Sequence, residues 1–276
     1  IRNRRNIKDS KLSDSEIITI SIVGELLTID SEKSFFSLLK REYKELFPRL
    51  GDRTRFNRTK RNLHLVISKI RGYISEFMQL YSNNIRVIDS MPIPVCEFGR
   101  AHFSKCFKGE ASYGICASKK ETYFGFKFHA LTTVDGFLTD YVITPANIDD
   151  RNAVWDLCDK YRSISIIGDK GYINKRLTPE LKSERDIDLL FLKRANSRDN
   201  YPKEVRQLLF KVRRRIETSF SQLTEQLNLN KVKSKSMLGF ITRTSIKVLA
   251  HNISFLINKL MRNDDSMAKI KRLVFG

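Results

Sequence analysis

Three acidic residues of this chain have the type and the surroundings that phosphoryl-transfer chemistry requires. Asp89 follows the apolar run R-V-I, Asp169 follows the run S-I-I-G, and Glu217 lies in the segment R-R-R-I-E-T-S-F. Carboxylate oxygens are the ligands that hard divalent cations prefer, and a pair of such cations can activate a nucleophile and stabilise the leaving oxygen of a phosphodiester. The three residues therefore predict a metal-dependent site that cuts or joins nucleic acid.

Each of the three also has an ordinary structural interpretation. Asp89 would be a turn residue before M-P, and Asp169 would cap the turn before G-Y-I-N. Glu217 would pair with Arg213 or Arg214 on the same helix. Acidic residues in turns are common, but three carboxylates that converge without a cation repel one another. The metal site is favoured because all three residues lie on elements that can meet.

The two aspartates are predicted to end neighbouring strands of one sheet. Alternating or continuous apolar residues predict strands over 85–90, 125–134, 137–144, 163–168 and 188–193. Asp135 and Gly136 form a hairpin signal between the second and third of these strands, while Asp149 and Asp150 precede a short helix and are expected to cap it. The order of strands and helices predicts a mixed α/β sheet with helices on its faces.

Glu217 is predicted to lie on an amphipathic helix that packs on this sheet. The helix has one apolar stripe, formed by Val205, Leu208, Leu209, Val212, Ile216, Phe220, Leu223 and Leu227. Glu217 lies about 100° around the helix from Ile216 and about 60° from Phe220, so it borders the stripe. We expect it to reach the end of the sheet, with Arg213 one turn earlier on the same face.

The first 80 or so residues are predicted to be helical throughout. Ser13 and Glu16 form a capping box ahead of the first helix, and Pro48 ends a second helix over 32–47. A third, long helix is expected to begin after Asp52 and to run to about residue 81. A last helix over 237–261 is expected to cover the outer layer of the sheet domain, since it carries no polar constellation of its own.

The charge balance favours a polyanionic partner. The chain has 51 Lys and Arg residues against 31 Asp and Glu residues, a formal net charge of +20 and a pI of about 9.9. Binding to duplex DNA should weaken with salt, with a log-log slope of about −0.9 per phosphate contacted. Ribosomal RNA or an acidic membrane surface would suit the same charge.

Eight basic residues lie between positions 49 and 71, in the third predicted helix and just before it. They are Arg49, Arg53, Arg55, Arg58, Lys60, Arg61, Lys69 and Arg71, with Phe56 among them. Such a face can contact a DNA backbone or enter a major groove, although a solvated face that only maintains solubility has the same composition.

Several other classes of protein are disfavoured. The apolar stretch 17–29 is too short to span about 30 Å of hydrocarbon, and the basic start leads into no secretory signal. The first residue is Ile, so we expect an upstream piece to be missing. Cys96, Cys106, Cys116 and Cys158 lack C-x-x-C spacing, so reduced thiols are expected, and a zinc site that includes His102 is the less favoured alternative.

Longer strings around the acidic residues resemble those of a known family. They are R-V-I-D-S-M-P-I-P-V-C, Y-F-G-F-K-F-H-A-L, F-L-T-D-Y-V-I-T-P-A-N-I-D-D-R, I-I-G-D-K-G-Y and R-R-R-I-E-T-S-F-S-Q-L, between about residues 85 and 230. The chain resembles bacterial insertion-sequence DDE transposases, whose catalytic domain has the ribonuclease H-like fold. It is most similar to the group numbered nine hundred and eighty-two, which the start L-S-D-S-E-I-I-T-I also resembles.

The resemblance implies roles for specific residues. Asp89, Asp169 and Glu217 would be the catalytic and metal-binding residues, with two Mg²⁺ or Mn²⁺ ions as cofactors. Related transposases often have the pattern Y-x2-R-x3-E-x6-K; here Arg213 and Glu217 match it, while Phe210 and Thr224 replace the tyrosine and the lysine. The expected DNA-binding residues are Arg53, Arg55, Arg58, Lys60, Arg61, Arg213, Arg214, Lys231 and Lys233, with Lys235 as a further substitute for the missing lysine.

The resemblance also implies an activity and an organisation. The protein would cleave DNA at transposon ends and transfer the strands to target DNA, as a homo-oligomer in the bacterial cytoplasm, associated with the nucleoid. We expect a helical DNA-binding region over 1–82, a catalytic domain over 83–261 and a basic tail over 262–276. The alternatives are a ribonuclease H-like nuclease without strand transfer, a catalytically silent DNA-binding derivative and, least favoured, an RNA-binding module.

Overall fold

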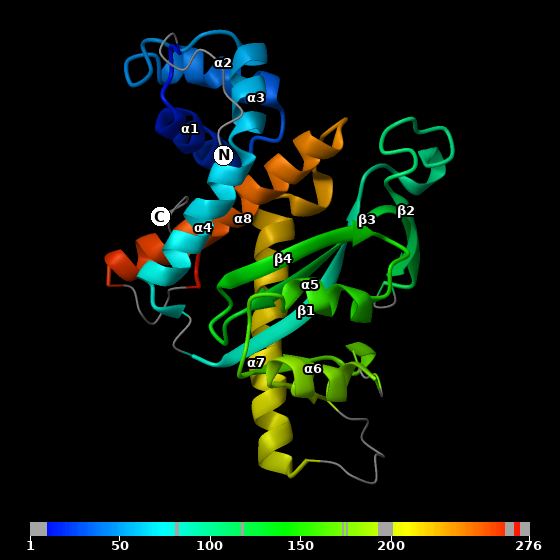
Figure 1. Cartoon of the computed structure of the whole chain (residues 1–276). Coiled ribbons are helices and arrows are strands. Elements are labelled where there is room, and N and C mark those ends of the chain that lie inside the picture. The colour runs from blue at the N-terminus through cyan, green and yellow to red at the C-terminus, as the bar shows by residue number, and fades with distance from the viewer. Residues whose placement is uncertain are drawn as a thin grey trace. The chain divides into compact units, whose positions relative to one another are not determined.

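The computed structural model describes residues 10–80, 83–116, 119–172, 174, 176–192, 201–262 and 268–270. The chain forms two compact units (Figure 1). The helical unit contains residues 1–74 and 222–276, and the sheet unit contains Ser75–Ser221. The predicted basic tail over 262–276 lies for the most part outside the described residues, as does Lys193 at the end of a predicted strand.

The helical unit begins with the capping box that the sequence predicts. The backbone N–H of Ser13 donates to the Glu16 carboxylate at 2.7 Å, and the N–H of Glu16 donates to the Ser13 hydroxyl at 3.2 Å. The helices of this unit are α1 (Asp14–Leu26), α2 (Glu32–Glu42), α3 (Arg53–Asn62), α4 (His64–Phe77, of which the residues to Ile74 belong here) and α8 (Met237–Leu260). A π-helical segment, Gln222–Gln226, and a 3-10 turn, Leu229–Lys231, precede α8.

Two predicted helices have different bounds in the structure. The second helix ends at Glu42 and not at residue 47. The third predicted helix is divided into α3 and α4 at Leu63, which is fully buried. The N–H of Leu63 bonds to the carbonyls of Lys60 and Arg61, a tighter turn that ends α3. The helical pattern of the sequence therefore runs through a turn that separates two helices in the structure.

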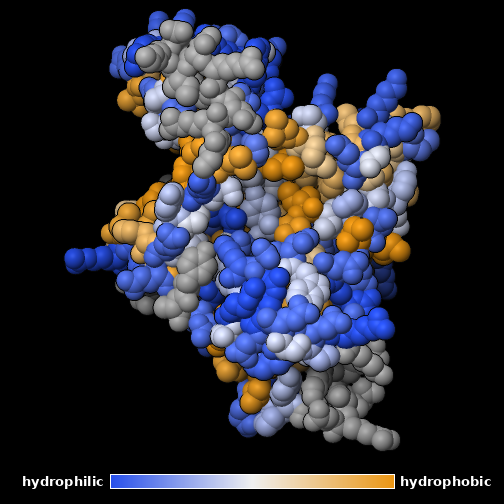
Figure 2. Space-filling view, in the orientation of Figure 1, coloured by the Kyte–Doolittle hydropathy of each residue, from blue (hydrophilic) through white to orange (hydrophobic). Residues whose placement is uncertain are grey.

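The core of the helical unit forms where α1, α3 and α8 pack together. The rings of Phe36 on α2 and Phe56 on α3 lie 5.6 Å apart between centroids. Gly24 allows Phe35 to approach α1, because a Cβ at this position would lie 2.6 Å from the Phe35 ring. Hydrophilic residues are gathered over α2 and α3 on the face that Figure 2 shows.

Contrary to the prediction from the sequence, helix α8 does not cover the sheet domain. It packs on α1 and α3 and belongs to the helical unit. Its buried charges explain this choice of partner: Arg243 donates to Glu25 of α1 at 3.0 Å, and Lys247 bonds to the same carboxylate and to the carbonyl of Leu227. An apolar stripe indicates that a helix is buried, but not against which element.

The sheet unit is a mixed α/β structure with helices on both faces, as the sequence predicts. Its strands are β1 (Ile85–Pro94), β2 (Ser112–Cys116), β3 (Glu121–Thr132), β4 (Leu138–Pro145), β5 (Ile164–Gly168) and β6 (Ile187–Phe191). These six strands form one sheet in the order β2-β3-β1-β5-β6, with β4 also paired to β3. The pairs of β3 with β1, β2 and β4 are antiparallel, whereas β5 pairs in parallel with β1 and with β6.

Alternate residues of the central strands face different helices. Ile166 and Leu189 contribute to the core that includes residues of α5 (Ala153–Leu157) and α6 (Leu177–Arg185). Ile167 packs on the opposite face with Leu209 of α7 (Lys203–Ser221). The continuous apolar run in β5 is therefore explained by burial of both of its faces.

The strand bounds differ from prediction at two places. β1 continues to Pro94 because it pairs with β3 along its whole second half, from Asp89 opposite Ala130 to Pro94 opposite Gly125. β2 was not predicted; it is short, and Ile115 on it is 75% exposed, so its sequence lacks an alternating apolar pattern.

Two predicted local structures are confirmed. The N–H of Gly136 donates to the carbonyl of Thr133 at 3.0 Å, which closes the hairpin turn between β3 and β4. The capping prediction holds for Asp149, whose carboxylate accepts from the N–H of Arg151 at 2.9 Å and caps the 3-10 turn before α5. Asp150 does not cap the helix; it pairs with Lys127 at 2.9 Å. No helix within the described residues has the length and apolar character needed to cross a membrane.

Candidate active site

Asp89 and Asp169 are brought to the same level of the sheet by the parallel pairing of β1 and β5. The pairing between these two strands ends with Val87 opposite Ile167. Each aspartate lies two positions after that pair. Asp169 lies just past the end of β5, as predicted, whereas Asp89 lies inside β1 and is not a turn residue.

Gly168, the residue before Asp169, allows close packing beneath the site. A Cβ at Gly168 would lie 2.9 Å from the Ile88 side chain and 3.4 Å from the Tyr172 ring. Ile88 and Tyr172 are both buried in the core beside α5 and α6. A larger residue at position 168 would therefore displace the backbone that carries the two aspartates.

Glu217 and Arg213 come from α7, which packs on β1 and β5. The two residues are four apart and so share a face of the helix. The apolar stripe that was predicted to bury this helix is present in part: Leu209, Ile216 and Phe220 are buried, while Val205 and Leu208 are exposed.

One guanidinium group joins the three carboxylates. The Nη2 atom of Arg213 lies 3.6 Å from Oδ2 of Asp89, 3.8 Å from Oδ2 of Asp169 and 3.4 Å from Oε1 of Glu217. The structure thus places the three predicted acidic residues around a common centre. It also contains the Arg213–Glu217 pair that is the ordinary interpretation of Glu217.

Backbone amides orient both aspartates. The N–H of Ser90 donates to Oδ1 of Asp89 at 2.8 Å, and the N–H of Lys170 donates to Oδ1 of Asp169 at 2.8 Å. In each case Oδ2 is the oxygen that faces Arg213. The exposed fraction of the side chain rises from 18% for Asp89 to 37% for Asp169 and 51% for Glu217, so the site opens to solvent on the Glu217 side.

The electrostatics of the site show a deficit of positive charge. The pKa of Asp89 is raised to about 6, mainly by burial and to a smaller extent by the charges of Asp169 and Glu217, although the Ser90 amide and Arg213 lower it. One guanidinium therefore does not fully compensate three carboxylates, two of which are partly buried.

The donor set suits a hard divalent cation in its chemistry, because three carboxylates face the same guanidinium. Within the described ranges, however, no group of three or more His, Cys, Asp or Glu side chains is arranged closely enough to hold a metal ion. Arg213 occupies the centre that these carboxylates share. Binding of a cation there would require the guanidinium to move aside.

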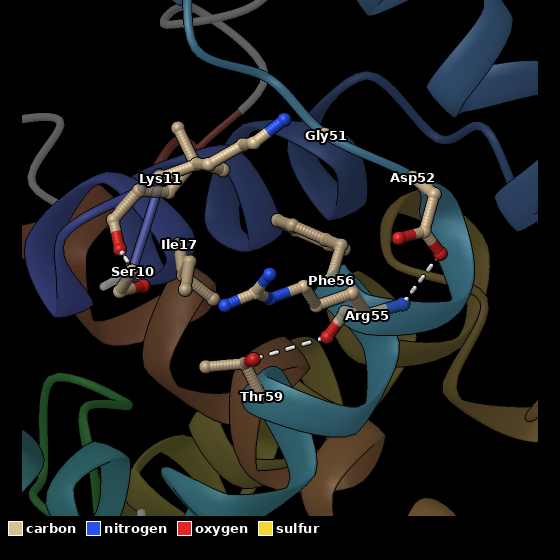
Figure 3. Close-up of a pocket in the computed structure, with 9 residues that line it drawn as sticks. Ser10, Lys11, Ile17, Gly51, Asp52, Arg55, Phe56 and Thr59 are labelled. Atoms are coloured by element: carbon tan, nitrogen blue, oxygen red, sulfur yellow. Dashed lines mark hydrogen bonds between the residues drawn. The ribbon is translucent and has the colours of Figure 1, made fainter. Parts of the chain in front are cut away.

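The predicted DNA-binding residues separate into several groups. Arg53, Lys60, Arg61 and Lys233 line one pocket of the helical unit. Arg55 lines a different, small pocket with Lys11, beside the Asp52 side chain that caps α3 (Figure 3). Arg58, Lys231 and Arg214 are exposed.

Sequence reasoning missed Arg243 as part of the basic pocket. This residue lies in the middle of an otherwise buried helix and is separated by about 180 residues from α3. The available signal was the presence of Arg243 and Lys247 within an apolar helical stretch, which predicts buried charges with partners elsewhere.

All four cysteines lie within the described residues and are free thiols. Cys96, Cys106 and Cys116 are half-buried free thiols, and Cys158 is a buried one. Burial raises the pKa of Cys158 to about 12, so it remains a protonated core residue. These findings agree with the reduced thiols that the sequence predicts and give no support to the zinc alternative.

Comparison with known proteins agrees with the geometry of the site. The family model described as "Transposase DDE domain" matches residues 80–237, which include all three carboxylates and Arg213. No curated protein and no solved structure matches the chain. The family model covers more than half of the chain, together with the strands and the helix that carry the acidic cluster. The chain therefore belongs to the family of DDE transposases.

Proposed function

We propose that this transposase cleaves DNA strands at the ends of a transposon and joins them to target DNA, with Asp89, Asp169 and Glu217 as the catalytic carboxylates. The observation that carries the proposal is the convergence of all three on one guanidinium, at 3.4 to 3.8 Å. Three carboxylates that come together repel one another, so their convergence lowers the stability of the fold. A catalytic role explains why they are nevertheless placed together.

The same carboxylates would hold two Mg²⁺ or Mn²⁺ ions. When bound, such ions activate an attacking hydroxyl or water and stabilise the leaving oxygen. The backbone amides of Ser90 and Lys170 fix Oδ1 of Asp89 and Asp169 and leave each Oδ2 directed to the centre of the cluster. Arg213 supplies the counter-charge in the metal-free protein and would move toward the DNA phosphate when cations replace it.

We further propose that the sheet unit is ribonuclease H-like and that the protein is related to the group numbered nine hundred and eighty-two. Support comes from a central strand, β1, that pairs antiparallel with β3 and parallel with β5, with an acidic residue at the same level on both parallel strands. The helical unit would bind transposon and target DNA, the active complex would be a homo-oligomer, and the protein would associate with the nucleoid.

A joining assay tests the proposal. The full chain is incubated with Mn²⁺, a supercoiled plasmid and a labelled duplex that ends in the inverted repeat flanking the coding region. We expect the label to appear in the plasmid for the unaltered chain and not for Asp169→Asn. Cleaved ends without any joined product would replace the proposal by a nuclease that uses the same carboxylates for hydrolysis only.

A further inference from the structure

The helical unit contains a pocket of about 400 Å³ whose walls come from distant parts of the chain. One wall is a face of α3, and the other is the segment that leads into α8 together with the first turns of that helix. The lining residues are Glu32, Arg53, Thr54, Asn57, Lys60, Arg61, Lys233, Ser234, Lys235, Ser236, Gly239 and Arg243. All of them belong to the helical unit.

The lining of this pocket is strongly cationic. It includes six basic side chains and one carboxylate, Glu32. That carboxylate accepts from Lys60 at 2.7 Å and from Asn57 at 2.5 Å, so it is already used inside the wall. Among the described residues, the basic side chains that line the pocket, apart from Lys60 and Arg243, form no ion pair. They are Arg53, Arg61, Lys233 and Lys235.

Arg243 gives an independent indication of a ligand. Its side chain is only 6% exposed, and its guanidinium is held by Glu25 at 3.0 Å and Asp30 at 3.5 Å. The remaining group, Nη1, is buried and has no hydrogen-bond partner among the described residues. A buried donor without a partner is unfavourable by about 1–3 kcal/mol. This donor belongs to a cationic side chain that lines the pocket, so an anion bound there would lie near unsatisfied positive charge.

The start of α8 adds a weaker attraction for anions at the same place. Ser236 caps this 24-residue helix and accepts from the N–H of Gly239 at 3.3 Å. The N-terminal end of a helix carries partial positive charge, which favours a phosphate group near it. Thr54, Asn57 and Ser234 place neutral polar groups on the same walls.

We propose that this pocket binds phosphodiester groups of the DNA backbone, and that α3 acts through this pocket and not as a uniformly basic face. The identity of the ligand rests on the proposed function, since that function makes DNA the partner. The contacts that the lining offers are charges and hydroxyls, which position a duplex without reading its sequence. Arg55 does not contribute to the pocket, and its own pocket, of about 30 Å³, is too small for a phosphodiester.

A matched pair of double variants tests the proposal. Lys233→Gln with Lys235→Gln removes two exposed charges that line the pocket. Lys33→Gln with Lys44→Gln removes two exposed lysines of the same unit that lie outside it. The full-length proteins are titrated with a labelled 30-base-pair duplex of arbitrary sequence between about 50 and 200 mM salt, after circular dichroism has shown that each variant is folded.

The log-log salt slope is the quantity to compare. We expect the pocket variant to lose about 1 to 2 units of slope and to bind more weakly, because each lost phosphate contact removes about 0.9. The control variant should change the slope by less than about half a contact. Equal losses in both variants, an unchanged slope in the pocket variant, or no DNA binding by the unaltered chain would each overturn the pocket assignment.

A second measurement locates the contact. Acetylation of lysines, followed by mass spectrometry, should show DNA protecting Lys233 and Lys235 more than Lys33 and Lys44. Failure of the proposed function would give a different result. DNA binding would still depend on Lys233 and Lys235, but no joined product would form. Joining that proceeds without pocket-dependent binding would reject the pocket alone.

Discussion

The Nη2 atom of Arg213 on α7 lies 3.6 Å from Oδ2 of Asp89 on β1. The same atom also faces Asp169 and Glu217, so one cation is shared among three anions. The side chain of Arg213 is 21% exposed, and solvent therefore screens these interactions only in part. This arrangement leads to a prediction about stability that is independent of activity.

Arg213→Gln should destabilise the metal-free protein by about 1–2 kcal/mol, because the three carboxylates lose the cation that they share. Arg214→Gln makes the same charge change at the next position, which is exposed, and should have little effect. Thermal unfolding in EDTA measures both. Addition of Mn²⁺ should restore the stability of Arg213→Gln, and equal melting temperatures for the two variants in EDTA would contradict the electrostatic role of Arg213.

Glu25→Ala should destabilise the helical unit strongly. Glu25 is 8% exposed and is bonded to both Arg243 and Lys247 of α8. Its removal deprives Lys247 of its carboxylate and leaves Arg243 with Asp30 alone, at 3.5 Å. Loss of one partner from a buried ion pair costs about 3–5 kcal/mol. Urea unfolding is the measurement, with the exposed Glu45→Ala as control. A loss below about 1 kcal/mol, typical of surface ion pairs, would show that solvent reaches this network.

His251 should make the helical unit less stable in mild acid. Burial lowers the pKa of this fully buried histidine to about 4, whereas the unfolded chain titrates near 6.5. Between pH 4 and pH 6.5 the unfolded state therefore binds more protons than the folded state. The free energy of unfolding falls by up to about 3 kcal/mol as the pH decreases from 6.5 to 4. Its Nε2 lies 3.0 Å from Oε1 of Gln222.

His251→Gln should flatten this pH dependence, because the amide does not titrate and can still donate to Gln222. Unfolding is followed in urea at several pH values. Part of the dependence should remain, since burial also lowers the pKa of His129 in the sheet unit to about 4. An identical pH profile for the variant and the unaltered chain would show that His251 becomes protonated without penalty.

Arg58→Ala combined with Arg61→Ala should reduce the salt slope of DNA binding, and the single variants should divide the effect unequally. Arg61 lines the basic pocket and should account for most of the change, about 0.9 units if one phosphate contact is lost. Arg58 lies outside the pocket and is exposed. Fluorescence anisotropy at several salt concentrations gives both slopes. A larger effect from Arg58 would favour the uniformly basic face of α3.

The acidic cluster could be predicted from the sequence because each of its members has a strong local signal. Asp89 and Asp169 follow apolar runs that only buried strands explain, and Glu217 borders the apolar stripe of a long helix. What the sequence did not supply is the length of β1. Asp89 lies inside that strand because pairing with β3 continues to Pro94, and such pairing depends on residues far along the chain.

The basic pocket could be predicted only in part. The positive charge of α3 is visible in the sequence, as are the lysines before α8, but their meeting depends on how α8 packs against α1 and α3. Helical periodicity shows which face of α8 is buried and not which unit buries it. The division of α3 from α4 at Leu63 was also missed, because the apolar residues keep helical spacing through this turn.

The most direct test of the central claim is metal-dependent cleavage by Asp169→Asn. The variant removes one of the three carboxylates, and Asp159→Asn, which changes an aspartate whose side chain is 83% exposed, is its control. In a Mn²⁺-dependent assay on duplex DNA, we predict that Asp169→Asn loses at least about 1000-fold in rate, equal to about 4 kcal/mol, and keeps its DNA affinity. Cleavage by Asp169→Asn at the rate of Asp159→Asn would contradict the assignment of Asp89, Asp169 and Glu217 as the catalytic site.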